Sequence, residues 1–96
     1  MPRFDFDPEK SALLRETRNI GFEEIIALMD AGYVPQILAH PNTKKYPHQK
    51  MYYVEIDDYI YAIPTVRNGD TVFMKTIYPS RKATRAHKRG GLHAKD

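Results

Sequence analysis

The chain has 96 residues, 42% hydrophobic and 28% charged, which is typical of one globular domain and excludes a disordered, fibrous or disulfide-rich protein. It contains no cysteine, so disulfide bonds and thiolate chemistry are excluded. The net charge of +3 is uneven: residues 80–96 carry six Lys or Arg and one acid, a net of +5, and the other 79 residues sum to −2.

The first third of the chain predicts a short strand and two helices. Residues 3–6 alternate polar and apolar, as a strand does. Asp7, Pro8 and Glu9 then supply a cap, a first helical residue and an acid near the positive end of the helix dipole. This helix is predicted to end near Arg18, where Asn19-Ile20-Gly21 breaks it. A second helix begins at Phe22, and its apolar residues share one face: Phe22, Ile25, Ile26 and Met29.

The middle of the chain predicts strands separated by turns. Residues 34–39 are apolar enough for a strand, and residues 40–49 have the prolines and polar residues of a loop. Residues 51–56 and 59–66 are rich in Tyr, Val and Ile, and they flank Asp57-Asp58. This arrangement predicts a tight hairpin.

The last third predicts one more strand and a basic helix. Residues 67–70 carry turn residues, and residues 71–78 follow as a continuous strand. Pro79 ends that strand, and Ser80 is suited to cap a helix in the basic segment. The same segment could instead be only a solvated tail. Gly90-Gly91 predicts a flexible end over residues 90–96.

This order of elements predicts an α+β fold. We expect two N-terminal helices packed on one face of an antiparallel sheet of four to five strands, followed by a C-terminal basic helix. Residues 1–89 would form a single domain. The segment MPRFDFDPEK has no long apolar run, and no stretch approaches the length of a membrane helix, so we expect a cytoplasmic protein without a membrane partner.

The predicted last strand bears the clearest candidates for chemistry. Alternation would place Lys75 on one face with two apolar residues, Phe73 and Ile77, and would place Val72, Met74, Thr76 and Tyr78 on the other. Lys75 would then be either a lysine that reaches for solvent at the sheet edge or a cation held on a rigid strand. Beyond it, Arg81 and Arg85 are one helical turn apart, and their repulsion would be relieved by a bound anion.

A second basic region lies in the predicted loop of residues 40–50. Its basic and aromatic side chains alternate, a pattern suited to pairing with phosphates and stacking on bases, although a long polar hairpin loop has the same composition. The candidate RNA-binding residues, including one from the C-terminal segment, are Lys44, Lys45, Tyr46, Lys50 and Lys82.

Metal and cofactor sites are not predicted. The four histidines, His40, His48, His87 and His93, do not form helical i, i+4 pairs, and no acid beside them completes a metal-binding pattern. No glycine-rich nucleotide loop precedes a helix.

Two stretches resemble the BrnT-like toxins of bacterial type II toxin–antitoxin pairs, which belong to the RelE-like group of small ribonuclease toxins. FDFDPEKSALLRETRNIGFEEI resembles the opening of that family, and SRKAT, residues 80–84, resembles its junction between last strand and C-terminal helix. Residues 34–66 match only as a set of strands. The matching positions in the opening stretch are Phe4, Asp7, Lys10, Ile20, Phe22, Glu23 and Glu24.

The resemblance implies a RelE/BrnT-like domain that cleaves RNA and is neutralised by a co-expressed antitoxin. Arg81 matches the arginine of the family's strand-to-helix junction. The chain departs from the family at two places. Thr17-Arg18 stands where the family often has Lys-His, and Thr76 stands where its last strand often carries an arginine.

Cleaving RNA without a metal requires a proton taken from the 2′-hydroxyl, a stabilised phosphorane and a proton given to the 5′-oxygen. We expect Arg81 and Arg85 to clamp the phosphate, Lys75 to act as a further clamp or proton carrier, and Tyr78 or His48 to act as general acid. These groups and the loop would converge on one anion-sized hollow. The alternatives are a module that binds an acidic partner or nucleic acid without catalysis, and an inactive relic of the fold.

Overall fold

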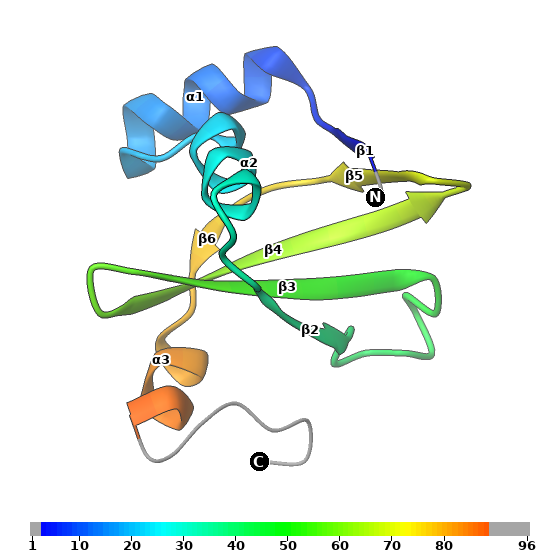
Figure 1. The fold of residues 1–96 in the computed structure, drawn as a ribbon. Coiled ribbons are helices and arrows are strands. Elements are labelled where there is room, and N and C mark those ends of the chain that lie inside the picture. The colour runs from blue at the N-terminus through cyan, green and yellow to red at the C-terminus, as the bar shows by residue number, and fades with distance from the viewer. Residues whose placement is uncertain (1–2, 89–96) are drawn as a thin grey trace.

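The computed structural model describes residues 3–88, which form an α+β fold with three helices and a six-stranded mixed sheet (Figure 1). The sheet order is β1-β5-β4-β3-β2, and β6 also pairs with β4. The α+β class is confirmed, but the sheet is not wholly antiparallel because β1 and β5 run parallel. The tail predicted at residues 90–96 lies outside the described residues. The elements are β1 (Arg3–Asp5), α1 (Pro8–Arg18), α2 (Phe22–Asp30), β2 (Gln36–Ala39), β3 (Gln49–Ile56), β4 (Tyr59–Asn68), β5 (Thr71–Met74), β6 (Tyr78–Pro79) and α3 (Arg81–Lys88).

The local signals at the helix and hairpin ends act as predicted. The Asp7 carboxylate accepts a hydrogen bond from the Glu9 N–H at 3.0 Å and caps α1. Asn19 ends that helix in the left-handed region, with φ of 61°. Asp57 and Asp58 both have positive φ, 53° and 64°, as a two-residue hairpin turn of the primed type requires.

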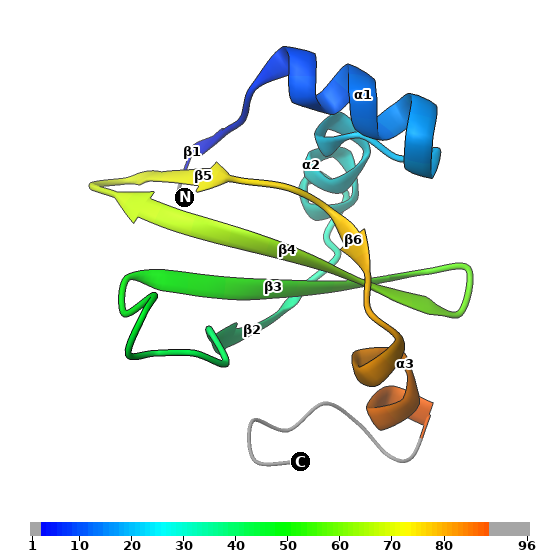
Figure 2. The same cartoon turned by 180° about the vertical axis from the view of Figure 1, so that it is seen from behind.

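Helices α1 and α2 cover one face of the sheet, and the main core lies between them and the strands (Figure 2). This burial is the principal stabilising term of the fold, because each of these apolar side chains is removed from water. We call this side of the sheet the helix face and the opposite side the far face. The buried core residues are Leu14, Ile20, Phe22 and Ile25 from the helical half, and Tyr52, Val54, Ile63, Val72, Met74 and Ile77 from the sheet half.

The chain between β5 and β6 contains one extra residue relative to β4. The Lys75 N–H donates to the Pro64 carbonyl at 2.9 Å, whereas Tyr78 pairs with Ala62. Three steps on this strand, from 75 to 78, therefore match two steps on β4, from 64 to 62. This mismatch defines a β-bulge, which bends a strand and changes which face its later side chains occupy.

The bulge overturns the prediction of a continuous strand over residues 71–78. Ile77 is fully buried in the core with Val72 and Met74, whereas Lys75 is exposed. Simple alternation predicted that Lys75 shares a face with Ile77, and that prediction is wrong. Tyr78, predicted to share a face with Val72, lies instead on the far face opposite Ala62.

Helix α3 is anchored on β4 through backbone groups. The Ile60 N–H donates to Thr84 Oγ1 at 2.9 Å, and the Ser80 N–H donates to the Ile60 carbonyl at 2.8 Å. The Ser80 hydroxyl accepts from the Ala83 N–H at 3.1 Å, so Ser80 caps this helix as predicted. The basic segment up to Lys88 is therefore an ordered helix held on the sheet, and the alternative of a solvated tail does not apply to it.

The turn between α1 and α2 is closed by a buried serine. Ser11 is fully buried, and its hydroxyl accepts a hydrogen bond from the Phe22 N–H at 2.9 Å while donating to the Glu23 carboxylate. Arg15 then pairs with Glu23 at 2.9 Å and with Glu24 at 2.7 Å. These hydrogen bonds satisfy a free N–H at the start of α2 and fix the angle between the two helices.

We expect Ser11→Ala to lower the free energy of unfolding by about 1–3 kcal/mol, because the buried Phe22 N–H would lose its acceptor. Urea denaturation measures this change. Thr17→Ala is the matched control, since its hydroxyl donates to the Leu13 carbonyl on the exposed side of the same helix. Equal losses in the two variants would contradict the role assigned to Ser11.

The same junction predicts how stability depends on pH. The hydrogen bond from Ser11 lowers the pKa of Glu23, and that from Arg15 lowers the pKa of Glu24. A depressed folded-state pKa adds stability above the unfolded-state pKa, and that stability is lost as the pH falls through the folded-state value. We therefore expect Glu24→Gln to destabilise the protein at pH 7 and to have less effect below about pH 4. A difference that stays constant from pH 7 to pH 3 would contradict this prediction.

Candidate active site

The cations of α3 lie at one end of the sheet, where β4 begins. Arg81 and Arg85 are exposed and one turn apart, and Lys82 is also exposed. Arg81 and Lys82 occupy the first turn, which contains no acid, and so they add to the positive end of the helix dipole. Cations placed there weaken a helix slightly but make its beginning attractive to an anion such as a phosphate.

The bulge places Lys75 and Tyr78 on the far face, and Tyr78 is two β4 positions from Ile60, where α3 is anchored. Lys75 is exposed and lies opposite Pro64. Tyr78 is 37% exposed and lies opposite Ala62. The two residues are separated by two β4 positions, about 7 Å at the antiparallel rise of 3.4 Å per residue. Of the residues predicted to be catalytic, Tyr78 therefore lies nearest to α3 with its Arg81 and Arg85, and Lys75 lies four β4 positions, about 14 Å, from Ile60, where α3 is anchored.

A second tyrosine, missed by the sequence prediction, lies in the same row as Tyr78. Ala62 pairs with Tyr53 on β3 and with Tyr78 on β6, so the two tyrosines flank an alanine on the far face. Burial raises the pKa of Tyr53, and the nearby Tyr78 hydroxyl raises it further. Burial also raises the pKa of Tyr78. Both phenols are therefore protonated at neutral pH and are able to donate hydrogen bonds or protons.

A histidine–carboxylate pair completes this side of the site, and the sequence prediction missed it as well. His87 Nε2 on α3 lies 3.1 Å from Glu55 Oε1 on β3, and both side chains are partly exposed. Glu55 is two positions from Tyr53 and therefore shares its face. His87 lies three residues after the buried Thr84, which places it on the side of α3 that packs on the sheet. These two spacings are the signals that could have identified the pair.

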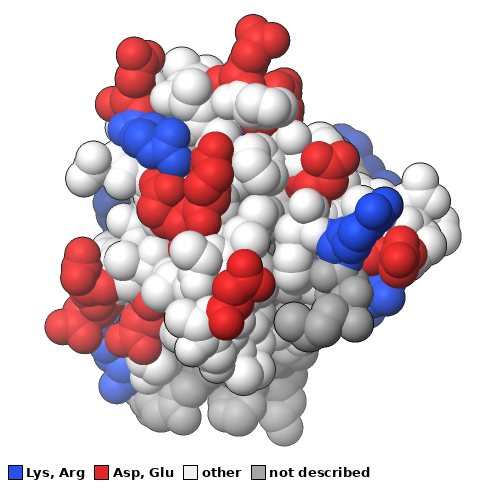
Figure 3. All heavy atoms as spheres, turned by 45° about the horizontal axis from the view of Figure 1, so that its top comes forward, with Lys and Arg blue, Asp and Glu red and all other residues white. Residues whose placement is uncertain are grey.

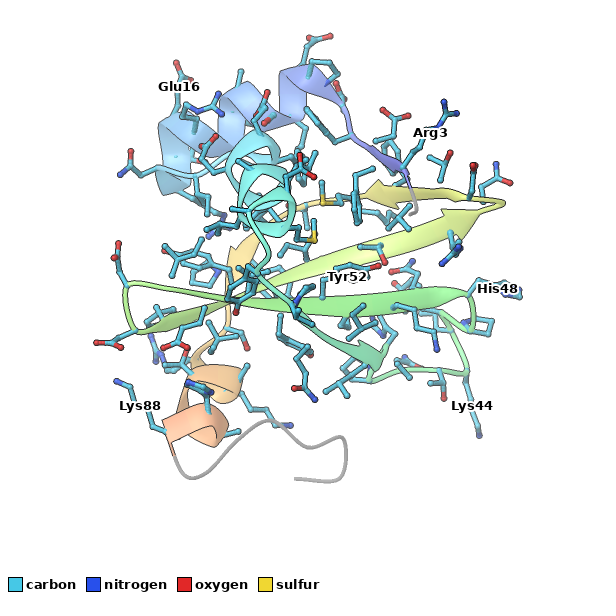
Figure 4. The ribbon with its side chains drawn as sticks, in the orientation of Figure 1. Arg3, Glu16, Lys44, His48, Tyr52 and Lys88 are labelled. Carbon is cyan, nitrogen blue, oxygen red and sulfur yellow. The ribbon has the colours of Figure 1, made fainter. Side chains whose placement is uncertain are left out.

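The loop between β2 and β3 lies at the opposite end of the sheet. Figure 4 shows Lys44 and His48 at one end of the molecule and Lys88 of α3 at the other. Six residues of β3 separate Gln49 at the loop from Glu55 beside α3, which corresponds to about 20 Å. The predicted convergence of the loop with the end of the last strand is therefore not observed. His48 does not lie with the other candidate catalytic residues.

The loop has a structure of its own that changes the role expected for its tyrosine. The Tyr46 ring packs on the His40 ring with centroids 4.5 Å apart, and Lys45 Nζ lies 5.4 Å from the Tyr46 centroid. Tyr46 is thus already engaged by its neighbours. Lys44 and Lys45 are exposed and remain suited to phosphate contacts. Lys50 is two positions from the core residue Tyr52 on β3, so it lies on the helix face.

The two helices α1 and α2 carry the opposite charge. Figure 3 shows Asp and Glu side chains gathered over this part of the molecule, with few Lys or Arg among them. The only basic residues of these two helices are Lys10, Arg15 and Arg18, and Arg15 is held in ion pairs. A polyanion is therefore repelled from the helical layer and attracted to the end of the sheet that carries α3. The acids of the two helices are Glu9, Glu16, Glu23, Glu24 and Asp30.

Comparison of the chain with protein-family models, with curated proteins and with solved structures found no match. Residues 3–88 include no helix with the length and hydrophobicity needed to cross a bilayer. In the same part of the chain, His, Asp and Glu side chains form no group of three or more that could hold a metal ion.

We expect Tyr78→Phe to lower the pKa of Tyr53, because the substitution removes the neighbouring hydroxyl. The pKa should stay above the ordinary value for tyrosine, since burial is the larger cause and is retained. NMR titration of ring-labelled tyrosine measures the change. Tyr59→Phe is the control because Tyr59 lies on the helix face, opposite Ile56. An unchanged Tyr53 pKa in Tyr78→Phe would show that the two phenols do not interact.

Proposed function

We propose that the chain is a metal-independent endoribonuclease of the RelE/BrnT-like toxin class. The observation that carries this proposal is the β-bulge, which puts Tyr78 on the far face two β4 positions from the Glu55–His87 pair, with Lys75 two positions further along the same face. Cations for a phosphate and groups able to move protons are thereby gathered at one end of the sheet. Metal-free RNA cleavage requires such a combination.

In the proposed mechanism His87 is the general base. A neutral imidazole that donates its Nε2 proton to the Glu55 carboxylate has a free lone pair on Nδ1. That nitrogen is suited to take the proton of a ribose 2′-hydroxyl, and Glu55 stabilises the imidazolium that forms. The oxygen then attacks the adjacent phosphorus, and a 2′,3′-cyclic phosphate forms as the bond to the 5′-oxygen breaks.

Tyr78 is the proposed general acid in the second half of the reaction. Its pKa, raised by burial, keeps the phenol protonated until the 5′-oxygen leaves and takes the proton. Arg81 and Arg85 stabilise the charge on the phosphorane oxygens, and Lys75, two β4 positions beyond Tyr78, holds the phosphate of a neighbouring nucleotide. Glu55 pairs with Ile60, and Tyr78 pairs with Ala62, which is two residues further along β4. The separation of about 7 Å leaves room for a phosphate between base and acid.

The biological role that accords with this activity is that of a toxin neutralised by a cognate antitoxin. The support for this role is the resemblance of residues 4–24 and 80–84 to the BrnT-like family, together with the far-face site. Lys44, Lys45 and Lys82 would add contacts to RNA phosphates outside the reacting nucleotide.

The direct test is cleavage of single-stranded RNA by purified protein in the presence of EDTA. We expect Arg81→Ala to reduce the cleavage rate about 10²–10³-fold, because a phosphate clamp is lost. We expect His87→Ala to reduce it about 10²–10⁴-fold, because the general base is lost.

His48→Ala is the matched control for a lost imidazole, and it should cleave at close to the wild-type rate because His48 lies at the other end of β3. Equal cleavage by wild type, Arg81→Ala and His87→Ala would reject this active site. Binding of RNA without any cleavage would favour the alternative of a non-catalytic binding module.

Expression in cells gives an independent measurement of the same proposal. We expect the wild-type chain alone to arrest growth and the His87→Ala variant to permit it at equal protein level, because RNA cleavage stops translation. Growth arrest by both proteins would indicate toxicity from binding or aggregation rather than from cleavage. Normal growth with the wild type would reject the toxin role.

A further inference from the structure

The far face carries an exposed phenylalanine that the proposed reaction does not use. Phe73 is 38% exposed and pairs with Val66 of β4. A single exposed apolar side chain is common on any protein surface. The position of Phe73 relative to Lys75 and Tyr78 is what distinguishes it.

These three side chains are evenly spaced along β4. Phe73 lies opposite Val66, Lys75 opposite Pro64 and Tyr78 opposite Ala62. Each step is two residues of β4, or about 7 Å, and every member lies on the far face. Aromatic, cationic and aromatic groups thus alternate along the segment from β5 to β6, next to β4, and lead to Arg81 at the start of α3. We call Phe73, Lys75, Tyr78 and Arg81 the edge strip.

The charges beside the edge strip determine which part of a ligand fits at each position. Asp5 of β1 pairs with Phe73, and its carboxylate is held by the Phe6 N–H at 2.8 Å. A phosphate is disfavoured next to that acid, whereas an uncharged base is accepted. Lys75 and Arg81 are exposed cations suited to phosphates. The pattern is therefore base at Phe73, phosphate at Lys75, base at Tyr78 and phosphate at Arg81.

We propose that the edge strip is a track for single-stranded nucleic acid, with Phe73 and Tyr78 as stacking platforms for two unpaired bases. Proteins that bind single strands combine aromatic platforms with cations in this way. A duplex does not fit the pattern because its bases are stacked on one another and are not free to lie on protein rings. The track rests on the proposed function, since it would lead a single strand into the proposed active site.

The absence of tryptophan from the sequence allows a direct test by fluorescence. Phe73→Trp puts one indole on the edge strip, and Ile37→Trp puts one on the helix face, at a side chain that is 48% exposed. The probe is a single-stranded DNA oligonucleotide, which lacks the 2′-hydroxyl needed for cleavage. We expect it to quench Phe73→Trp strongly and Ile37→Trp little, and we expect a duplex of equal length to quench neither.

Affinity measurements with the same DNA complete the test. Phe73→Ala should weaken binding of the single strand about tenfold. It should leave binding of an abasic strand unchanged, because that strand has no base to stack. Equal quenching by duplex and single strand, equal loss for the abasic strand, or no quenching by any oligonucleotide would overturn the track.

This outcome is separable from the outcome for catalysis. Cleavage of RNA without quenching of Phe73→Trp would reject the track and leave the proposed function standing. Selective quenching by single strands in a protein that cuts no RNA would support the track and reject the ribonuclease.

Discussion

The candidate site depends on a single irregularity in the hydrogen bonding of β4. Lys75 and Tyr78 both lie on the far face only because one residue is in excess between β5 and β6. In a regular strand two residues an odd number of positions apart face opposite sides of the sheet. The bulge therefore allows Ile77 to be buried in the core while Lys75 before it and Tyr78 after it both stay exposed on the far face.

The anchoring of α3 extends this constraint to the arginines. The helix is tied to the backbone of Ile60 through Ser80 and Thr84, so its position follows from the position of β4. His87 reaches Glu55 from the same helix. The proposed base, acid and cations are thus positioned by three strands and a helix that are joined by hydrogen bonds. Such rigid support favours catalysis, which requires groups held in place before the substrate arrives.

The separation of charge between the two sides of the molecule favours the approach of a polyanion from one side. The acidic helices α1 and α2 would repel a polyanion, and their one central cation, Arg15, is occupied by Glu23 and Glu24. The loop that carries Lys44 joins β3 at Gln49, about 20 Å along the strand from Glu55, so it would touch a distant part of a bound strand rather than the reacting phosphate.

The sequence by itself determined the elements whose signals are local. Asp7 and Pro8 start α1, Asn19 ends it, Asp57-Asp58 turn the hairpin, and Ser80 starts α3, because each acts on backbone groups within a few residues. These signals also identified the basic helix and, through Arg81 and Arg85, part of the candidate site.

Only the tertiary structure decided which residues meet. The parallel pairing of β1 with β5, the bulge at residues 75–78, the contact between Glu55 and His87, and the distance from His48 to α3 all depend on strand register. Register is fixed by hydrogen bonds between segments far apart in the chain, and a shift of one residue moves a side chain to the opposite face. Alternation along one strand does not show where a bulge occurs, so the prediction from alternation placed Tyr78 on the wrong side of the sheet.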